Sequence, residues 1–128
     1  MLCLDFAKVA KVVEQNPDVI PVAVQNADTK EVILVAYTNR EAFERSVRTR
    51  IATFWSTSRK ELWIKGKTSG NFFELTEVRV NCEQNSLVYL VRPKGEGICH
   101  TRNSKGTAHN CYYRRLNLEM GILESMDP

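Results

Sequence analysis

Three of the four cysteines lie in polar stretches of the second half of the chain, at Cys82, Cys99 and Cys111. Each is expected at a strand end or a loop edge, where a metal ion or a substrate can reach the thiol. Three thiolates would hold Zn²⁺ tetrahedrally and leave one position for water, as in catalytic zinc sites. Such a water can supply hydroxide near neutral pH. The alternative is that these cysteines are buried and inert. Cys3, at the start of the predicted N-terminal helix, looks like an ordinary small hydrophobe.

A histidine and a polar turn accompany these cysteines. His100 follows the second of them directly and is a candidate proton carrier, although a structural or surface role fits its position equally well. Asn81, Glu83 and Asn85 alternate around the first cysteine, and their side-chain oxygens could approach one hard cation. One carboxylate and two amides make a weak Mg²⁺ site, so a plain polar turn is favoured.

The stretch 54–71 holds both tryptophans, Trp55 and Trp63, among cationic and hydroxyl side chains. A flat anionic ligand suits this composition, because rings stack on Trp while Arg, Lys and hydroxyls bind phosphate. The alternative is an amphipathic hairpin whose tryptophans pack inward and whose charges face solvent. The stretch alone does not separate these two interpretations.

Length and charge limit the classes of protein. With 128 residues the chain has room for one domain, which we expect to span 1–128. A net charge of +3 fits an anionic small molecule and is too small to indicate a nucleic-acid partner. No apolar run approaches the roughly 18 residues of a transmembrane helix, and Asp5, Lys8 and Lys11 argue against a signal peptide. We therefore expect a cytoplasmic protein with no membrane partner.

The elements that must position these residues follow from periodicity and capping. Residues 4–13 predict a short helix, and 18–25 with 31–37 predict a strand hairpin, with Pro21 at a sheet edge or a strand start. Thr38 and Glu41 form a capping-box pattern for a helix to about residue 48. That helix is expected to turn Ala42, Phe43 and Val47 inward.

Further strands are expected at 51–56, 62–65, 72–81, 86–91 and 111–116. In the strand expected at 72–81, apolar and polar residues do not alternate cleanly, so its inward face is irregular. We therefore expect a twist or a bulge there. Residues 102–110 have loop composition, and 117–128 could form a short helix or fray. The sum is an α+β domain with an antiparallel-rich, roll-like sheet and two short helices.

Together these motifs resemble the phosphoribosyl-AMP cyclohydrolase family of histidine biosynthesis. The resemblance covers about residues 20–115 and is carried by Pro21, Gln25 and Thr29, by Glu41 and Ala42, by Trp55-Ser-x-Ser-Arg59, by Leu62-Trp63-x-Lys65-Gly66-x-Thr68-Ser69-Gly70-Asn71, by Cys99-His100-Thr101, and by Cys111-Tyr112-Tyr113-Arg114.

This resemblance implies an enzyme that hydrolyses the N1–C6 bond of the adenine ring in 1-(5-phosphoribosyl)-AMP. It implies Zn²⁺ held by Cys82, Cys99 and Cys111 at a site built across an intertwined homodimer, with His100 as the base. Residue type then selects the candidates for contacts with the nucleotide substrate, which are Trp55, Ser58, Arg59, Lys65, Thr68 and Ser69.

The chain departs from the family pattern in three places. The family has three Asp around its first cysteine, where this chain has Asn81, Glu83 and Asn85, which weakens the Mg²⁺ prediction. Thr57 stands where the family has Arg, and 102–110 is an insertion. These departures support an alternative, namely a homologue that binds a nucleotide without catalysis or acts on another N1-substituted purine nucleotide.

Overall fold

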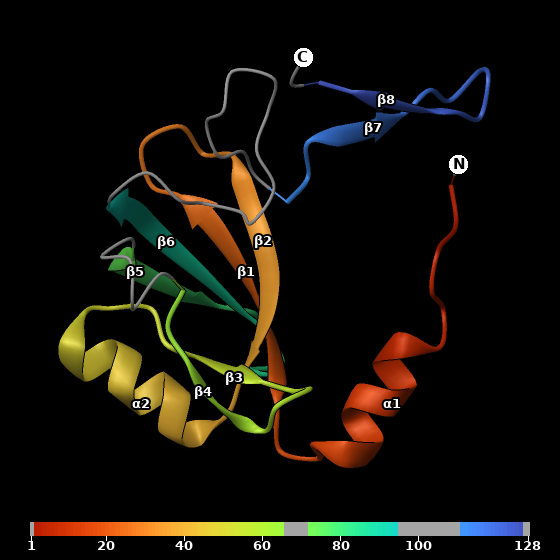
Figure 1. The fold of residues 1–128 in the computed structure, drawn as a ribbon. Helices are drawn as coiled ribbons and strands as arrows, with labels where there is room; N and C mark the ends of the chain where they lie inside the picture. The colour runs from red at the N-terminus through yellow and green to blue at the C-terminus, as the bar shows by residue number, and fades with distance from the viewer. Residues whose placement is uncertain (1, 66–71, 95–110, 127–128) are drawn as a thin grey trace.

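The computed structural model of the protein describes residues 2–65, 72–94 and 111–126. Figure 1 shows the arrangement of its helices and strands. They follow one another as α1 (Lys8–Gln15), β1 (Ile20–Asn26), β2 (Val32–Thr38), α2 (Arg40–Thr49), β3 (Phe54–Ser56), β4 (Glu61–Trp63), β5 (Phe72–Val80), β6 (Leu87–Lys94), β7 (Arg114–Leu116) and β8 (Leu123–Ser125).

A four-stranded sheet in the order β2-β1-β6-β5 forms the body. The β1–β2 and β5–β6 pairs are antiparallel, and the central β1–β6 pair is parallel. The α+β class and the two helices are thus confirmed, while the sheet is mixed. The short pairs β3–β4 and β7–β8 stand apart from it.

The core lies on one face of this sheet. Buried side chains of β1, β2 and β6 meet those of β3 and β5, and they include Val22, Val24, Ile33, Phe54, Phe73, Tyr89 and Val91. Because apolar burial is the main favourable term in folding, Phe54 and Phe73 fix β3 and β5 against the central strands.

Helix α2 begins one residue later than the capping-box pattern predicts. The N-cap is Asn39, whose Oδ1 accepts from the Ala42 amide at 2.9 Å, so the prediction of Thr38 as the cap is wrong. Asn is as good a cap as Thr, because its short side chain reaches the same amides. Ala42 is buried, but Val47 is 36% exposed and Ser46 takes the inward position instead.

Several strand ends also differ from the predictions. Strand β6 continues through Arg92 and Pro93 to Lys94, because Pro93 pairs with Phe73 of the edge strand β5. The expected bulge in β5 is confirmed by a register shift between Leu75 and Glu77. Pro21 is the second residue of β1, which confirms the strand-start alternative.

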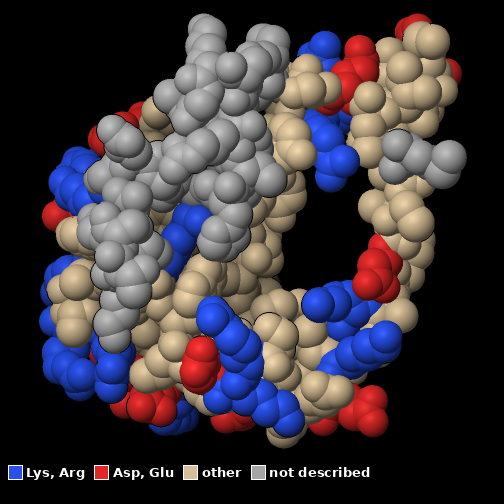
Figure 2. Space-filling view, viewed as in Figure 1, with Lys and Arg blue, Asp and Glu red and all other residues tan. Residues whose placement is uncertain are grey.

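The C-terminal segment is a hairpin, not a helix or a frayed end. Strands β7 and β8 pair in antiparallel register, with Arg114 opposite Ser125 and Leu116 opposite Leu123. Figure 1 shows this hairpin and the N-terminal segment with α1 extending away from the body. Figure 2 shows open space between these arms and the body. No helix among the described residues is long and apolar enough to cross a membrane.

Candidate active site

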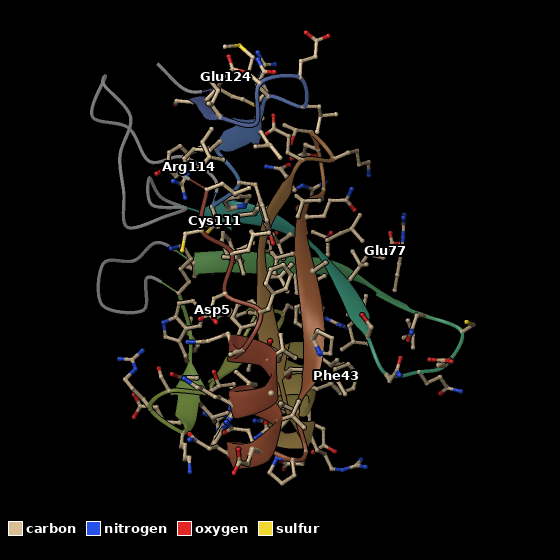
Figure 3. All side chains as sticks on the ribbon, turned by 90° about the vertical axis from the view of Figure 1, so that its right-hand side faces the viewer. Asp5, Phe43, Glu77, Cys111, Arg114 and Glu124 are labelled. Atoms are coloured by element: carbon tan, nitrogen blue, oxygen red, sulfur yellow. The ribbon has the colours of Figure 1, made fainter. Side chains whose placement is uncertain are left out.

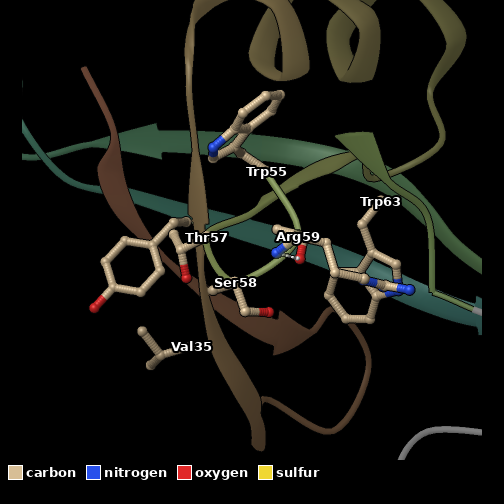
Figure 4. A pocket seen from close by; sticks show the side chains of 9 residues that line it. Val35, Trp55, Thr57, Ser58, Arg59 and Trp63 are labelled. Atoms are coloured by element: carbon tan, nitrogen blue, oxygen red, sulfur yellow. Dashed lines mark hydrogen bonds between the residues drawn. The ribbon is translucent and has the colours of Figure 1, made fainter. Parts of the chain in front are cut away.

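A cavity of about 270 Å³ lies between edge strand β2 and the β3–β4 hairpin. Figure 4 shows it from close by. Its lining comes from β2 and from the expected ligand-binding stretch, and consists of Val35, Ala36, Tyr37, Trp55, Ser56, Thr57, Ser58, Arg59 and Trp63. Three of the predicted substrate-binding residues, Trp55, Ser58 and Arg59, are therefore brought together around one hollow.

The hairpin that carries the cavity is held by its own turn and by one buried ring. Phe54 pairs with Trp63, and their ring centroids are 5.5 Å apart. At the turn, the Lys60 amide donates to the Ser56 carbonyl at 2.7 Å, and Lys60 has a positive φ of 54°. The Arg59 amide donates to Ser56 Oγ at 3.3 Å. These bonds fix the turn that presents Ser58 and Arg59.

The two tryptophans bear on both interpretations of this stretch, of which ligand binding stays a prediction. The hairpin is confirmed, and Trp63 packs against the core. Both indoles also line the cavity and remain partly exposed. Trp55 is further fixed by its indole N–H, which donates to Asn16 Oδ1 at 3.0 Å. Trp63 is thus held by the core and Trp55 by Asn16, while both indoles border the cavity.

The charged candidates of this stretch lie in different surroundings. The Arg59 guanidinium is exposed and lies 3.5 Å from Glu61 Oε1. Such surface pairs contribute little stability, so a phosphate can replace the carboxylate at small cost. Lys65 is only 8% exposed and does not line the cavity. Thr68 and Ser69 lie outside the described residues.

Two of the predicted zinc ligands lie at opposite edges of the sheet. Cys82 is exposed in the turn after β5. Cys111 is exposed, and its amide donates to the carbonyl of Ile33 in β2 at 3.0 Å. Figure 3 shows Cys111 and Glu77 of β5 on opposite sides of the view. Cys99 and His100 lie outside the described residues, as does the 102–110 insertion.

One chain cannot bring Cys82 and Cys111 to the same metal ion. Strands β1 and β6 separate the two edges, and neighbouring strands lie about 4.8 Å apart, so the cysteines are separated by roughly 10–14 Å across the sheet. Sulfurs that share a zinc ion lie within about 4.6 Å of each other, since each Zn–S bond is about 2.3 Å. Within residues 2–65, 72–94 and 111–126, no three His, Cys, Asp or Glu side chains lie close enough together to hold a metal ion.

The turn around Cys82 is closed by side-chain amides. Asn81 Oδ1 accepts from the amides of Asn85 and Ser86 at 2.9 and 3.0 Å, and Asn81 Nδ2 donates to Asn85 Oδ1 at 2.7 Å. Asn85 Nδ2 in turn donates to Glu83 Oε2 at 3.3 Å. The oxygens that would face a cation are engaged within the turn, and Glu83 is the single carboxylate among the three. This donor set does not fit Mg²⁺, which prefers carboxylates and water.

Two polar groups of the interior escaped the sequence predictions. Asn16 is 4% exposed and bonded to Trp55, although its position before Pro17 indicates only a helix end. Burial raises the pKa of the Tyr89 hydroxyl, and the side chains of Ser46 and Thr38 lower it in part. Both of those hydroxyls donate to backbone carbonyls, and no described residue hydrogen-bonds the Tyr89 oxygen with good geometry.

Comparison of the sequence with known proteins identifies its family. The profile described as phosphoribosyl-AMP cyclohydrolase matches residues 34–113. The phosphoribosyl-AMP cyclohydrolase of Archaeoglobus fulgidus is 47% identical over 97 residues, which are 76% of this chain and 84% of the relative. That of Nitrosopumilus maritimus is 47% identical over 88 residues, which are 69% of this chain and 81% of the relative.

The histidine biosynthesis bifunctional protein of Thermus thermophilus is 46% identical over 97 residues, which are 76% of this chain and 42% of that protein. The match to residues 34–113 includes the whole lining of the cavity and the three cysteines Cys82, Cys99 and Cys111. The chain therefore belongs to the phosphoribosyl-AMP cyclohydrolase family.

Proposed function

We propose that this chain hydrolyses the N1–C6 bond of 1-(5-phosphoribosyl)-AMP, as a step of histidine biosynthesis. The observation that carries the proposal is the cavity with its two tryptophans and one exposed arginine, which lies entirely within the segment that matches the family. An adenine ring and phosphate groups are the two kinds of chemistry that such a lining suits.

The reaction consumes one water molecule. Substitution at N1 withdraws electrons from the ring and makes C6 electrophilic. The water oxygen forms a bond to C6, the C6–N1 bond breaks, and the electron pair leaves with N1. C6 retains its exocyclic nitrogen and becomes a carboxamide: one proton of the water goes to that imino nitrogen, which becomes NH₂, and the other passes to N1. His100 is our candidate to carry that proton.

The residues of the cavity would position the substrate for this step. The indoles of Trp55 and Trp63 would stack on a ring, and Arg59 with Ser58 would bind a phosphate. Fixing the purine relative to the attacking water removes much of the entropic cost of the reaction. Lys65, Thr68 and Ser69 remain proposed contacts with phosphate or ribose.

The zinc ligands in this proposal are Cys82, Cys99 and Cys111. The thiols of Cys82 and Cys111 are exposed, three cysteine thiolates are a suitable donor set, and zinc bound there would lower the pKa of a water ligand toward neutrality. We propose no Mg²⁺ at Asn81, Glu83 and Asn85, because the amides close the turn themselves.

A homodimer that shares the metal site reconciles these ligands with the fold. Cys82 and Cys111 lie at opposite edges of one sheet, so they can meet only if they come from different chains. The arms also expose large apolar side chains, such as Phe6 at 90% and Leu118 at 89%. A lone two-stranded hairpin like β7–β8 is only marginally stable in water. A second copy of the chain in the space beside the arms would bury these apolar side chains and support the β7–β8 hairpin.

Purified protein tests the activity directly. Incubated with 1-(5-phosphoribosyl)-AMP and zinc, it should yield a product heavier by one water molecule, measured by mass spectrometry. Cys82→Ser should abolish the product, and exposed Cys3 provides the matched control, since Cys3→Ser should leave turnover unchanged. Absence of product from the wild type would refute the activity.

A second candidate function has its own support. The closed amide turn and Thr57 in place of the family's Arg fit a homologue that binds a nucleotide without hydrolysing it, or that acts on another N1-substituted purine nucleotide. Tight binding of AMP without turnover of phosphoribosyl-AMP would select the first of these. Location in the cytoplasm and a single domain over 1–128 remain predictions.

A further inference from the structure

Asn16 is a buried amide that joins the N-terminal helix to the candidate site. It follows α1 directly and is 4% exposed. Its Nδ2 donates to the Val12 carbonyl at 3.1 Å and to the Thr57 carbonyl at 3.3 Å. Its Oδ1 accepts from Trp55 Nε1 at 3.0 Å.

The chemistry of the partners fixes the orientation of this amide. An indole N–H can only donate and a carbonyl can only accept, so Oδ1 must face Trp55 while the NH₂ group faces the two carbonyls. Both hydrogens of the NH₂ group are then used on separate carbonyls. A buried polar group that is satisfied in this way resists displacement, because each lost partner costs a desolvation penalty.

Both bonds from Asn16 into the hairpin reach residues that line the cavity. Trp55 and Thr57 belong to the lining, and Trp55 is a residue that we expect to stack on the ligand. The bond to the indole N–H sets the rotation of that ring about its side-chain axis. The bond to the Thr57 carbonyl holds the turn that presents Ser58 and Arg59. Asn16 itself does not line the cavity, so it can act only through these two residues.

We propose that Asn16 is a positioning residue for nucleotide binding, which holds the Trp55 ring and the Thr57 backbone in their binding geometry. The family match begins at residue 34, so both Asn16 and helix α1 lie outside it. The inference rests on the proposed function in one respect, namely that the cavity takes a nucleotide. It assigns to α1 a role in substrate affinity beyond its packing.

The link to Trp55 can be observed without any ligand. The chain has only two tryptophans, so a nitrogen–proton correlation spectrum shows two indole signals. Trp55→Phe assigns them by removing one. Asn16→Ala should move the Trp55 signal and leave the Trp63 signal in place.

Affinity for AMP, measured by calorimetry, is the main readout because it does not require turnover. We expect Asn16→Ala to weaken AMP binding about tenfold, a change of about 1.4 kcal/mol. KM for phosphoribosyl-AMP should rise by a similar factor with kcat within about twofold, which is the signature of lost uniform binding. Trp55→Phe, which keeps a ring but lacks the N–H, removes the same bond from the other side and should weaken AMP binding by at least the same factor.

Val12→Ala is the matched control, because it loosens the packing of α1 but leaves the Val12 carbonyl and the amide bonds in place. It should leave AMP affinity within about twofold of wild type, because an aliphatic side chain makes no hydrogen bond to Trp55 or Thr57. If Asn16→Ala shifts the Trp55 signal and AMP binds as in wild type, the inference is wrong. If Val12→Ala weakens binding as much as Asn16→Ala, the role is only structural and the inference is again overturned.

The same experiment separates this inference from the proposed activity. Wild-type protein that binds AMP but does not turn over phosphoribosyl-AMP refutes the activity alone, and the AMP affinities then decide on Asn16. Wild-type protein that turns over phosphoribosyl-AMP without binding AMP keeps the activity, and an unchanged KM in Asn16→Ala then overturns the inference alone.

Discussion

Ser46 joins α2 to the chain that leads into the site hairpin, and its removal has a calculable cost. The side chain is fully buried, as is Thr53 just before β3. Ser46 Oγ accepts from the Thr53 amide at 2.8 Å and lies 2.9 Å from the Ala42 carbonyl and 3.0 Å from the Thr53 carbonyl, to which it can donate. Ser46→Ala therefore leaves the Thr53 amide buried without an acceptor.

The expected loss is about 2–3 kcal/mol in the free energy of unfolding, the middle of the roughly 1–4 kcal/mol that the separate contributions span. An unsatisfied buried amide costs about 1–3 kcal/mol and a lost hydroxyl bond about 0.5–1.5 kcal/mol, while the better helix propensity of Ala returns about 0.5 kcal/mol. With an unfolding entropy of about 2.1 cal/mol/K per residue, the melting temperature should fall by about 7–11 °C.

Urea unfolding at equal protein concentrations measures this loss, since association would otherwise change the apparent stability. Thr49→Ala is the matched control. Thr49 makes the same kind of bond in the same helix, from Oγ1 to the Arg45 carbonyl at 2.8 Å, but it is exposed. The control should lose less than about 1 kcal/mol. If Ser46→Ala loses no more than Thr49→Ala, the bond between Ser46 and Thr53 does not anchor the hairpin.

Further outcomes follow from the site and the core. Arg59→Ala should raise KM for phosphoribosyl-AMP about tenfold in steady-state kinetics, with Arg59→Lys intermediate, because a point charge replaces a fork of donors; an unchanged KM would exclude Arg59 as a phosphate ligand. Mg²⁺ added to zinc-loaded wild type should give no binding heat at the Asn81–Asn85 turn, whereas the double variant Asn81→Asp, Asn85→Asp should bind it; binding by wild type alone would contradict the closed turn. Because burial raises the pKa of Tyr89, the folded state keeps this proton after the unfolded chain loses it near pH 10. The contribution of this group to stability is complete below about pH 10 and is lost as the pH rises toward the folded-state pKa. The free energy of unfolding, measured with urea at several pH values, should therefore fall less steeply above about pH 10 in Tyr89→Phe than in wild type. An unchanged pH dependence would rule out this coupling.

Local patterns predicted much of the fold because the elements concerned are short-range. The β1–β2 hairpin follows from two β-branched runs with a turn between them, and the bulge in β5 follows from a face that does not alternate cleanly. The hairpin of the tryptophan stretch is equally local. Helix α2 shows the limit of such patterns, since Thr38 and Asn39 are adjacent good caps and only packing selects Asn39.

Non-local pairings could not be predicted in this way. The parallel contact of β1 with β6 joins residues more than sixty positions apart, and nothing in either strand specifies the partner. Strand β7 lies within the predicted strand at 111–116, but β8 and its pairing with β7 were missed because both strands have only three residues and little alternation. The role of Asn16 was missed because its partners, Trp55 and Thr57, lie about forty positions further along the chain.

The most direct test of the shared metal site combines two inactive variants. Cys82→Ser and Cys111→Ser chains, co-expressed with different affinity tags, can be purified as the mixed dimer. If each site takes Cys82 from one chain and Cys111 from the other, one of the two symmetric sites carries both serines and the other is intact. We predict about half of the wild-type turnover of phosphoribosyl-AMP from the mixed dimer and none from either variant alone. A mixed dimer that remains as inactive as its parents would contradict a site shared between chains.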